Sequence, residues 1–268
     1  MTRIAIIGLG EAGRLYAAGL SRAGAEVRGY DPYLDTRADG GPDVDQRDDL
    51  ADTVRGADVV LSLVGATAAV EVAAHTLPLM DATTLFADLN TTSPGAKYEI
   101  ARLAALAGVR MADVAVLAPV PRDGHRTALL ASGVGAEDFV AAMASFGMSV
   151  TVVPGAAGEA ARMKLLRSVF MKGLAALVIE SLGAARASGS EEWLRDRIAQ
   201  ELGEGGAALV DRLVTGSYEH APRREQEVRA SLAELEASGQ PADMTRATLA
   251  WFERILAERD PGRRDPVE

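Results

Sequence analysis

The sequence predicts an α/β fold: an N-terminal domain with a doubly wound, mostly parallel sheet, followed by an all-α C-terminal domain. Short β-branched runs alternate with Ala-rich helical segments as far as Val153, and such alternation is typical of parallel sheets covered by helices. After Pro154 no strand-like run remains, and the pattern indicates helices only. We therefore expect domains at 1–154 and 155–260, with 261–268 as a disordered tail.

The individual elements follow from hydrophobic patterning and turn residues. Arg3 to Ile7 is predicted as the first strand and Glu26 to Tyr30 as the second. Further strands are predicted at 59–64, 85–89, 109–114, 128–132 and 149–153. Helices are predicted at 67–77, 95–106, 156–188, 191–201, 206–213, 223–237 and 244–259.

Composition excludes several classes of function. The chain has 268 residues and a net charge of −10, which argues against nucleic acid or an anionic membrane as the main partner. It has no cysteine, and His75, His125 and His220 lie far apart, so we predict no metal site. The first strand begins by Arg3, and we expect no targeting segment, no membrane-spanning run and a cytoplasmic location.

A glycine motif follows the first strand and opens a helix. In such a turn the first glycine permits the sharp bend, the second lets the backbone approach a pyrophosphate, and the third allows close helix packing. The motif predicts a Rossmann domain that binds a nicotinamide dinucleotide, and a purely structural turn is the alternative. The residues assigned to the cofactor here are Gly8, Leu9, Gly10, Glu11, Ala12 and Gly13.

Asp31 ends the second strand, where a carboxylate can bind the adenosine ribose hydroxyls and repel a 2′-phosphate. This favours NAD as the cofactor. The alternative is that Asp31 only starts the Asp-Pro turn, and Arg37 lies close enough in sequence to leave NADP open.

Small and polar residues follow two later strands, at the edge where ligands bind in parallel sheets. For the polar residues before Pro94, turn and N-cap chemistry is an equally good account. We assign Val64, Gly65, Asn90 and Thr91 to the cofactor, and Thr92 and Ser93 to the substrate.

Lys164 lies on a predicted helix among apolar neighbours. Burial beside a cofactor would allow such a lysine to exchange a proton near neutral pH, as interconversion of a hydroxyl and a carbonyl requires. A solvated surface charge is the alternative.

The segment Gly155 to Ser168 resembles the catalytic-helix motif of the β-hydroxyacid dehydrogenase family, within the 6-phosphogluconate dehydrogenase-like superfamily. In that family glycines precede a catalytic lysine, and an asparagine follows four residues later. Residues 88–94 and 113–120 resemble the family's ribose-side and substrate-loop segments, in the same order. The resemblance implies that Lys164 is the acid/base and Ser168 its catalytic partner, with a substrate loop at Val116, Leu117 and Ala118.

Two residues depart from the family motif. Ala160 occupies the position of the family's third glycine, and Ser168 occupies that of the asparagine, so the hydrogen bonds to the substrate must differ. The chain is closer to a branch with a short helical C-terminal domain and no assigned substrate, which it resembles at 118–121, 164–168 and 220–227.

The last of these segments places an imidazole and two guanidiniums, His220, Arg223 and Arg224, at a predicted helix start. These residues can form a salt-bridged helix end, which is the simpler interpretation, or a site that binds an anionic substrate, which is the functional interpretation.

The apolar run from Met163 through Ile179 predicts core or dimer interface, and we expect a homodimer through the C-terminal helices.

Together these features predict an NAD(P)-dependent oxidoreductase that transfers a hydride between nicotinamide and a small anionic hydroxy acid or related alcohol. Imine or enamine reduction on the same fold is one alternative. A non-catalytic dinucleotide-binding protein is another.

Overall fold

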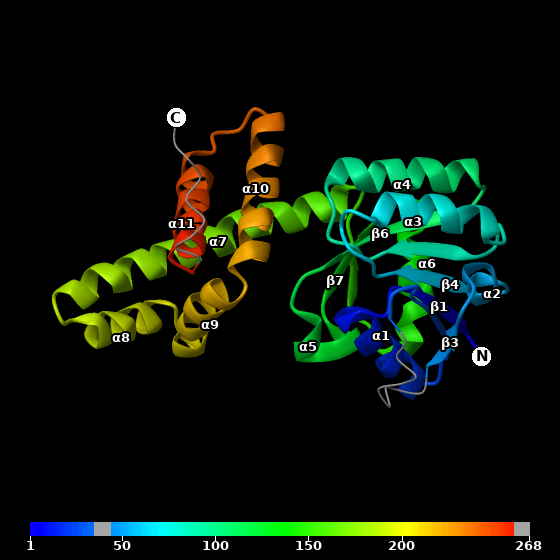
Figure 1. Cartoon of the computed structure of the whole chain (residues 1–268), viewed down its shortest axis with the longest axis horizontal. Coiled ribbons are helices and arrows are strands. Elements are labelled where there is room, and N and C mark those ends of the chain that lie inside the picture. The colour runs from blue at the N-terminus through cyan, green and yellow to red at the C-terminus, as the bar shows by residue number, and fades with distance from the viewer. Residues whose placement is uncertain (35–43, 260–268) are drawn as a thin grey trace. The chain divides into compact units, whose positions relative to one another are not determined.

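The structure, a computed structural model, describes residues 1–34 and 44–259. It contains two compact units, Met1–Lys164 and Leu165–Glu268, through which Figure 1 traces the chain. The expected C-terminal tail and Arg37 lie outside the described residues.

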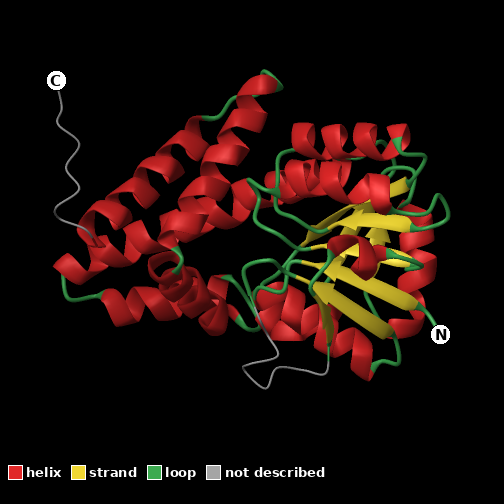
Figure 2. Ribbon diagram, turned by 45° about the vertical axis from the view of Figure 1, so that its right-hand side comes forward, coloured by secondary structure: helices red, strands yellow, loops and turns green. Residues whose placement is uncertain are grey.

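The first unit is built on a sheet, whose strands are yellow in Figure 2. In its described part the sheet has eight strands, in the order β3-β2-β1-β4-β5-β6-β7-β8. Neighbouring strands are parallel except β6 and β7, which are antiparallel. The predicted mostly parallel sheet is thus confirmed. The strands are β1 (Arg3–Ile7), β2 (Glu26–Tyr30), β3 (Asp45–Arg47), β4 (Val59–Ser62), β5 (Leu85–Asp88), β6 (Arg110–Val116), β7 (Leu129–Ser132) and β8 (Val150–Val152).

Helices bury both faces of this sheet, which explains why most positions of its central strands are apolar on both faces. Ile4 and Ile6 of β1 belong to one core cluster, and Ala5 and Ile7 belong to a second. Helices α1 and α6 contribute to the first cluster, and α3 and α4 to the second. The helices of this unit are α1 (Glu11–Arg22), α2 (Leu50–Val54), α3 (Ala69–Thr76), α4 (Pro94–Leu106), α5 (Val120–Asp123) and α6 (Ala136–Met143).

The strand β3 was not predicted. Its sequence is Asp45-Gln46-Arg47, which carries no apolar pattern, and it forms by backbone pairing with β2 at the edge of the sheet. Such a strand depends on its neighbour rather than on its own residue types.

The second unit is helical. Two apolar clusters form its core, and both include residues of α7, among them Val178 and Ile179. Helix α9 runs past the predicted end at Leu213. The helices are α7 (Glu159–Ala187), which starts in the first unit, α8 (Glu191–Glu201), α9 (Gly206–Glu219), α10 (Ala221–Ala237) and α11 (Asp243–Arg259).

The composition of helix α7 differs from the expectation that the chain has no membrane-spanning run. By length and composition it is apolar enough to cross a membrane, so the expectation that no run approaches a membrane span is wrong. Within the second unit, α7 contributes to both apolar clusters, and the core helix of a soluble protein passes the same test.

The two units divide inside α7 rather than before it, at Lys164 instead of at 154. The reason lies in the first turns of the helix. The backbone N–H groups of Gly158 and Ala161 donate to a side chain of β6, and that of Ala160 donates to one of β7.

Candidate active site

The motif glycines lie between β1 and α1. Gly8 has φ of +93°, and a Cβ atom there would lie 2.5 Å from the carbonyl oxygen of Leu63. A Cβ atom on Gly13 would lie 1.9 Å from the carbonyl oxygen of Gly8. At Gly10, by contrast, no described atom beyond its two chain neighbours lies within 4 Å of the Cβ position. The turn needs Gly8 and Gly13 for its own geometry and leaves open space at Gly10.

Helix α1 starts directly after Gly10, and no described side chain caps it. Uncapped first-turn N–H groups and the positive end of the helix dipole suit a pyrophosphate. Glu11 is exposed and Ala12 half-buried in this turn, whereas the Leu9 side chain is buried in the core. The turn therefore fits a dinucleotide, with Leu9 serving its structure.

The carboxylate of Asp31 bridges two backbone groups. Its Oδ2 accepts a hydrogen bond from the N–H of Leu9 over 2.9 Å, and its Oδ1 accepts one from the N–H of Tyr33 over 2.9 Å. The second bond closes the turn that was the alternative account of this residue. The first bond holds the carboxylate beside the glycine turn, where the adenosine ribose lies in Rossmann domains.

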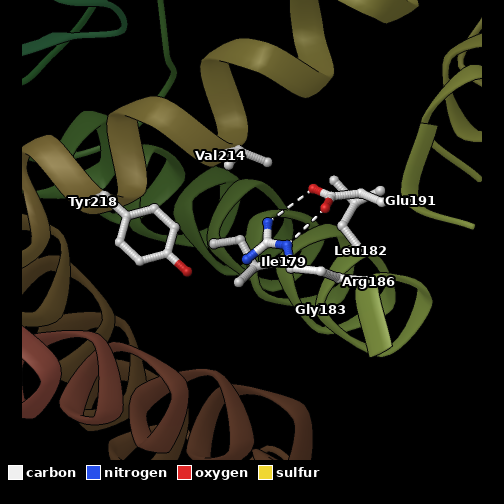
Figure 3. Close-up of a pocket in the computed structure, with 7 residues that line it drawn as sticks. All are labelled: Ile179, Leu182, Gly183, Arg186, Glu191, Val214 and Tyr218. Carbon is white, nitrogen blue, oxygen red and sulfur yellow. Dashed lines mark hydrogen bonds and ion pairs between the residues drawn. The ribbon is translucent and has the colours of Figure 1, made fainter. Parts of the chain in front are cut away.

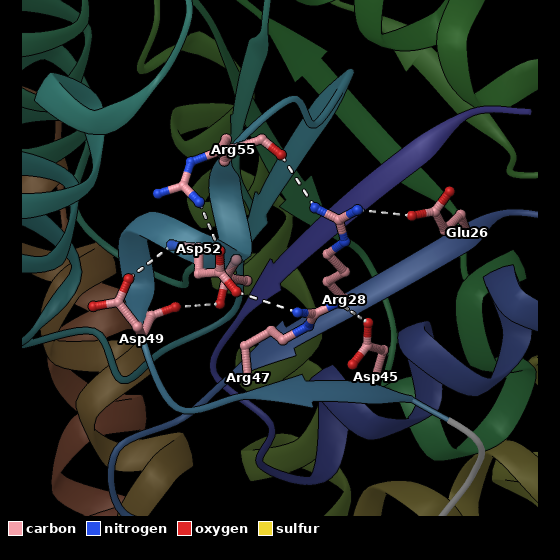
Figure 4. Close-up of polar contacts among 8 residues, drawn as sticks. Glu26, Arg28, Asp45, Arg47, Asp49, Asp52 and Arg55 are labelled. Carbon is pink, nitrogen blue, oxygen red and sulfur yellow. Dashed lines mark hydrogen bonds and ion pairs between the residues drawn. The ribbon is translucent and has the colours of Figure 1, made fainter.

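Arg47 of β3 and Arg55, which directly follows α2, form ion pairs with carboxylates (Figure 4). Asp52 accepts from Arg47 over 3.2 Å and from Arg55 over 2.8 Å, and Arg47 also pairs with Asp45. These pairs join β3 to α2, so we assign neither arginine to a cofactor phosphate. Arg37, on which the NADP alternative rested, lies outside the described residues.

The ends of β4 and β5 lie side by side, since Ser62 pairs with Asp88 in the sheet register. Asn90 follows β5, is buried, and donates from Nδ2 to Ser62 Oγ over 2.9 Å and to Asp88. Its Oδ1 and the Oγ1 of Thr92 are buried without a hydrogen-bond partner among the described residues. Such atoms are costly unless paired, so this strand end fits a ligand that donates hydrogen bonds.

The other predicted strand-end residues differ in exposure. Val64 is half-buried and Gly65 exposed after β4. Ser93 caps α4, since its Oγ accepts from the N–H of Ala96 over 3.2 Å. The carboxyl end of β6 carries three half-buried residues, Val116, Leu117 and Ala118.

Lys164 lies against the end of β5. Its Nζ donates a hydrogen bond to the Oγ1 of Thr91 over 2.8 Å, and the lysine is half-buried rather than enclosed by the first unit. Ser168 follows one turn later on the same helix and is buried. The structure thus brings the candidate acid/base to the polar edge of the sheet.

The three candidate substrate residues of the second unit lie at the junction of α9 and α10. His220 is exposed and precedes α10. Arg223 is exposed, with its Nε 3.7 Å from Glu227. Arg224 donates to Ser217 Oγ over 2.8 Å, and burial lowers the pKa of its guanidinium. Arg223 is therefore the more accessible of the two arginines.

A small pocket also lies within the second unit (Figure 3). Arg186 donates two hydrogen bonds to Glu191, over 2.6 and 2.8 Å, and these lower the pKa of Glu191. Because the two charges satisfy each other, we assign the pocket no ligand. Its lining residues are Ile179, Leu182, Gly183, Arg186, Glu191, Val214 and Tyr218.

Residues 1–34 and 44–259 contain no group of three or more His, Asp or Glu side chains arranged to hold a metal ion. Sequence reasoning missed a buried charged cluster formed by Asp88, Lys97 and Asp113. A carboxylate inside each of two apolar strands was the signal for it, because buried carboxylates require partners.

The glycine turn, the carboxylate after the second strand and the polar strand ends define the first unit as a Rossmann domain for a nicotinamide dinucleotide. Residues 3–153 match the family model described as the NAD binding domain of 6-phosphogluconate dehydrogenase, and residues 185–255 match a domain of unknown function, DUF1932. The chain belongs to this NAD-binding family, and it is a β-hydroxyacid dehydrogenase-like protein with a helical C-terminal domain. The expected NAD(P) cofactor is confirmed, and the chain is an NAD(P)-dependent oxidoreductase by family.

Solved structures show the same fold over 96% or more of the chain. A conserved hypothetical protein from Sinorhizobium meliloti is 32% identical, with a TM-score of 0.76 and coverage of 100% of this chain and 92% of that one. A 3-hydroxyisobutyrate dehydrogenase from Mycobacterium tuberculosis is 21% identical, with a TM-score of 0.79 and coverage of 96% and 94%. A reductive aminase from Aspergillus terreus is 18% identical, with a TM-score of 0.63 and coverage of 98% and 96%.

Proposed function

We propose that the protein is a dehydrogenase that transfers a hydride between NAD(P) and a small anionic hydroxy acid or related alcohol. The observation that carries this proposal is the hydrogen bond of Lys164 to Thr91, which sets an ammonium group at the carboxyl end of β5. That edge is where substrates meet the cofactor in Rossmann enzymes.

The protein's own groups handle the proton in this reaction. When bound, the nicotinamide accepts or supplies the hydride. In the oxidative direction neutral Lys164 takes the hydroxyl proton as the carbonyl forms, and in reduction its ammonium returns that proton. Thr91 orients the amine, and Ser168, one turn along α7, positions the reacting oxygen.

We further propose that Arg223 supplies the charge that selects an anionic substrate, with His220 and Arg224 beside it in sequence. A guanidinium presents a planar fork that matches a carboxylate or phosphate. Among the described residues, the ion pair of Arg223 is a long one of 3.7 Å to Glu227, which an anion can displace at little cost.

The test is a panel of hydroxy acids with NAD and NADP, run on the wild type and on Lys164→Ala. Turnover by the wild type and a loss of about a hundredfold or more in the variant, with NADH binding retained, support the proposal. Equal turnover by both proteins contradicts the role of Lys164. Bound cofactor without turnover of any substrate favours the dinucleotide-binding alternative.

Imine or enamine reduction is the second candidate, because a reductive aminase shares the two-domain fold. Lys164 would then supply a proton to the reduced nitrogen product rather than take one from a hydroxyl. Cyclic imines in the same panel separate the two reactions, since reduction of imines without oxidation of any hydroxy acid reverses the order of the candidates.

We also propose that the protein is a cytoplasmic homodimer through its C-terminal helices. Leu166, Phe170 and Leu177 of α7 are 50%, 67% and 58% exposed, and their spacing puts them on one face of the helix. A second copy would cover such a stripe. Sedimentation of the wild type as a dimer and of Phe170→Glu as a monomer supports this arrangement, whereas a monomeric wild type contradicts it.

A further inference from the structure

Lys97 is a buried lysine held by two carboxylates. It lies on α4 and is 1% exposed, and lysines are almost never so buried unless paired. Its Nζ lies 2.8 Å from Asp88 Oδ2 and 3.1 Å from Asp113 Oδ1, and it donates to the Asp88 carbonyl oxygen over 2.7 Å. One hydrogen bond and two ion pairs therefore hold the ammonium group.

Lys97 is the only described partner of those two carboxylate oxygens. Asp88 and Asp113 are register neighbours on β5 and β6, and both are fully buried. Apart from the contact with Lys97, Asp88 Oδ2 and Asp113 Oδ1 have no partner among the described residues. Without this lysine, two buried carboxylates would face each other with no cation between them.

The other oxygen of Asp113 anchors the start of α7. Asp113 Oδ2 accepts from the N–H of Gly158 over 2.9 Å, from the N–H of Ala161 over 3.2 Å, and from Ser132 Oγ over 3.1 Å. Ser132 Oγ in turn accepts from the N–H of Ala160 over 3.0 Å. A carboxylate at this end of a helix satisfies first-turn N–H groups and complements the helix dipole.

Close packing on α4 fixes the same point. Gly158 has φ of +107°, and a Cβ atom there would lie 2.9 Å from the carbonyl oxygen of Pro94, the first residue of α4. The start of α7 therefore rests on the start of the helix that carries Lys97. Lys164 lies one turn beyond the anchored Ala161.

The cluster also holds the strand end that Lys164 contacts. Asp88 accepts from Asn90 Nδ2, and Asn90 directly precedes Thr91. The ion pairs of Lys97 thus tie together the two segments whose side chains meet in the hydrogen bond between Lys164 and Thr91.

We propose that Lys97 is a positioning residue that acts through Asp88 and Asp113 to fix Lys164 against Thr91. The inference rests on the proposed role of Lys164 as acid/base. It adds a residue that touches neither substrate nor cofactor and that sets the geometry of the group that does.

The lysine content of the chain allows a direct test. The sequence has three lysines, at positions 97, 164 and 172, so protein labelled with isotopic lysine gives three side-chain NMR signals. Lys97→Met and Lys172→Met assign their own signals by deletion. In Lys97→Met we expect the Lys164 signal to shift while the Lys172 signal stays in place as the internal control.

Activity supplies the second measurement. In folded Lys97→Met we expect kcat to fall by about a hundredfold, because small displacements of a catalytic group are that costly. The dissociation constant for NADH should change less than kcat, since the polar contacts of Lys97 described above are with Asp88 and Asp113 and not with the glycine turn at 8–13. An unmoved Lys164 signal, or an unchanged kcat in folded variant protein, overturns the proposal.

Ser132→Ala covers the case in which Lys97→Met does not fold. It removes one anchor of α7 and keeps both ion pairs, so a smaller shift of the Lys164 signal is expected. No shift in that variant also overturns the proposal. Because the NMR signals need no substrate, the result stands apart from the proposed reaction: a shifted Lys164 signal in a protein that turns over no substrate contradicts only the proposed function.

Discussion

The Nζ of Lys164 donates a hydrogen bond to the Oγ1 of Thr91 over 2.8 Å. The two residues lie far apart in sequence, one on α7 and one after β5. Their contact brings the lysine to the strand ends where Asn90 and Thr92 have buried polar atoms without described partners. It is the contact on which the proposed reaction depends.

Thr91→Val removes the hydroxyl acceptor and keeps the side-chain shape. A hydrogen bond to a charged group is worth about 1.5–3 kcal/mol, so we expect kcat to fall by roughly tenfold to a hundredfold. Thr91 is exposed, and the melting temperature should change little. Steady-state kinetics beside Thr91→Ser, which retains the hydroxyl, checks this, and equal losses in both variants would contradict it.

Substitutions at Gly10 and at Gly13 should have different effects, the first on cofactor binding and the second on folding stability. Gly10→Val places a side chain in open space, so we expect normal thermal stability and loss of NADH binding. Gly13→Ala forces a Cβ atom against the Gly8 carbonyl and should cost about 1–3 kcal/mol or more of stability. Fluorescence titration with NADH and thermal unfolding of both variants test the pair, and NADH binding by Gly10→Val would refute the assignment.

Asp31→Ser should move the cofactor preference toward NADPH. Removing a carboxylate near a 2′-phosphate relieves a repulsion of about 1–4 kcal/mol, which is a change of roughly tenfold or more in the ratio of the two dissociation constants. Asp31→Asn is the matched control, because its amide oxygen can still accept from the N–H of Leu9. If both variants keep the wild-type preference, Asp31 serves only the turn.

His125 should make folding stability depend on pH. Its ring lies against Gly19 of α1, and its Nε2 lies 3.1 Å from the carbonyl oxygen of Phe146. Burial is the main cause that lowers the pKa of His125 below its ordinary value of 6.5, and nearby arginines add to this. The unfolded chain therefore binds the proton more readily than the folded one. The stability that the neutral His125 ring contributes is complete above pH 6.5 and is lost as the pH falls below that value.

Melting curves of the wild type between pH 8 and pH 5 test this prediction against His125→Gln. We expect the wild type to lose more stability than the variant over the lower half of that range. Parallel curves for the two proteins would show that the imidazole does not contribute.

The local elements could be predicted because their signals are local. The first strand at 3–7, the helix at 191–201 and the start of the helix at 206 have the predicted bounds, since β-branched runs, helix formers and glycines act within a few residues. The polar strand Asp45–Arg47 could not be predicted, because its partner strand rather than its residue types makes it a strand.

The sequence by itself determined the class of this protein: a Rossmann domain with a dinucleotide turn, followed by helices, in a β-hydroxyacid dehydrogenase-like chain. Only the tertiary structure decided which groups meet. Lys97 pairs with Asp88 and Asp113, and Lys164 hydrogen-bonds Thr91, because sheet register and helix packing bring distant segments together. The sequence around a charged group or a hydroxyl does not indicate which residue it will pair with, since the fold and not the neighbouring residues determines that partner.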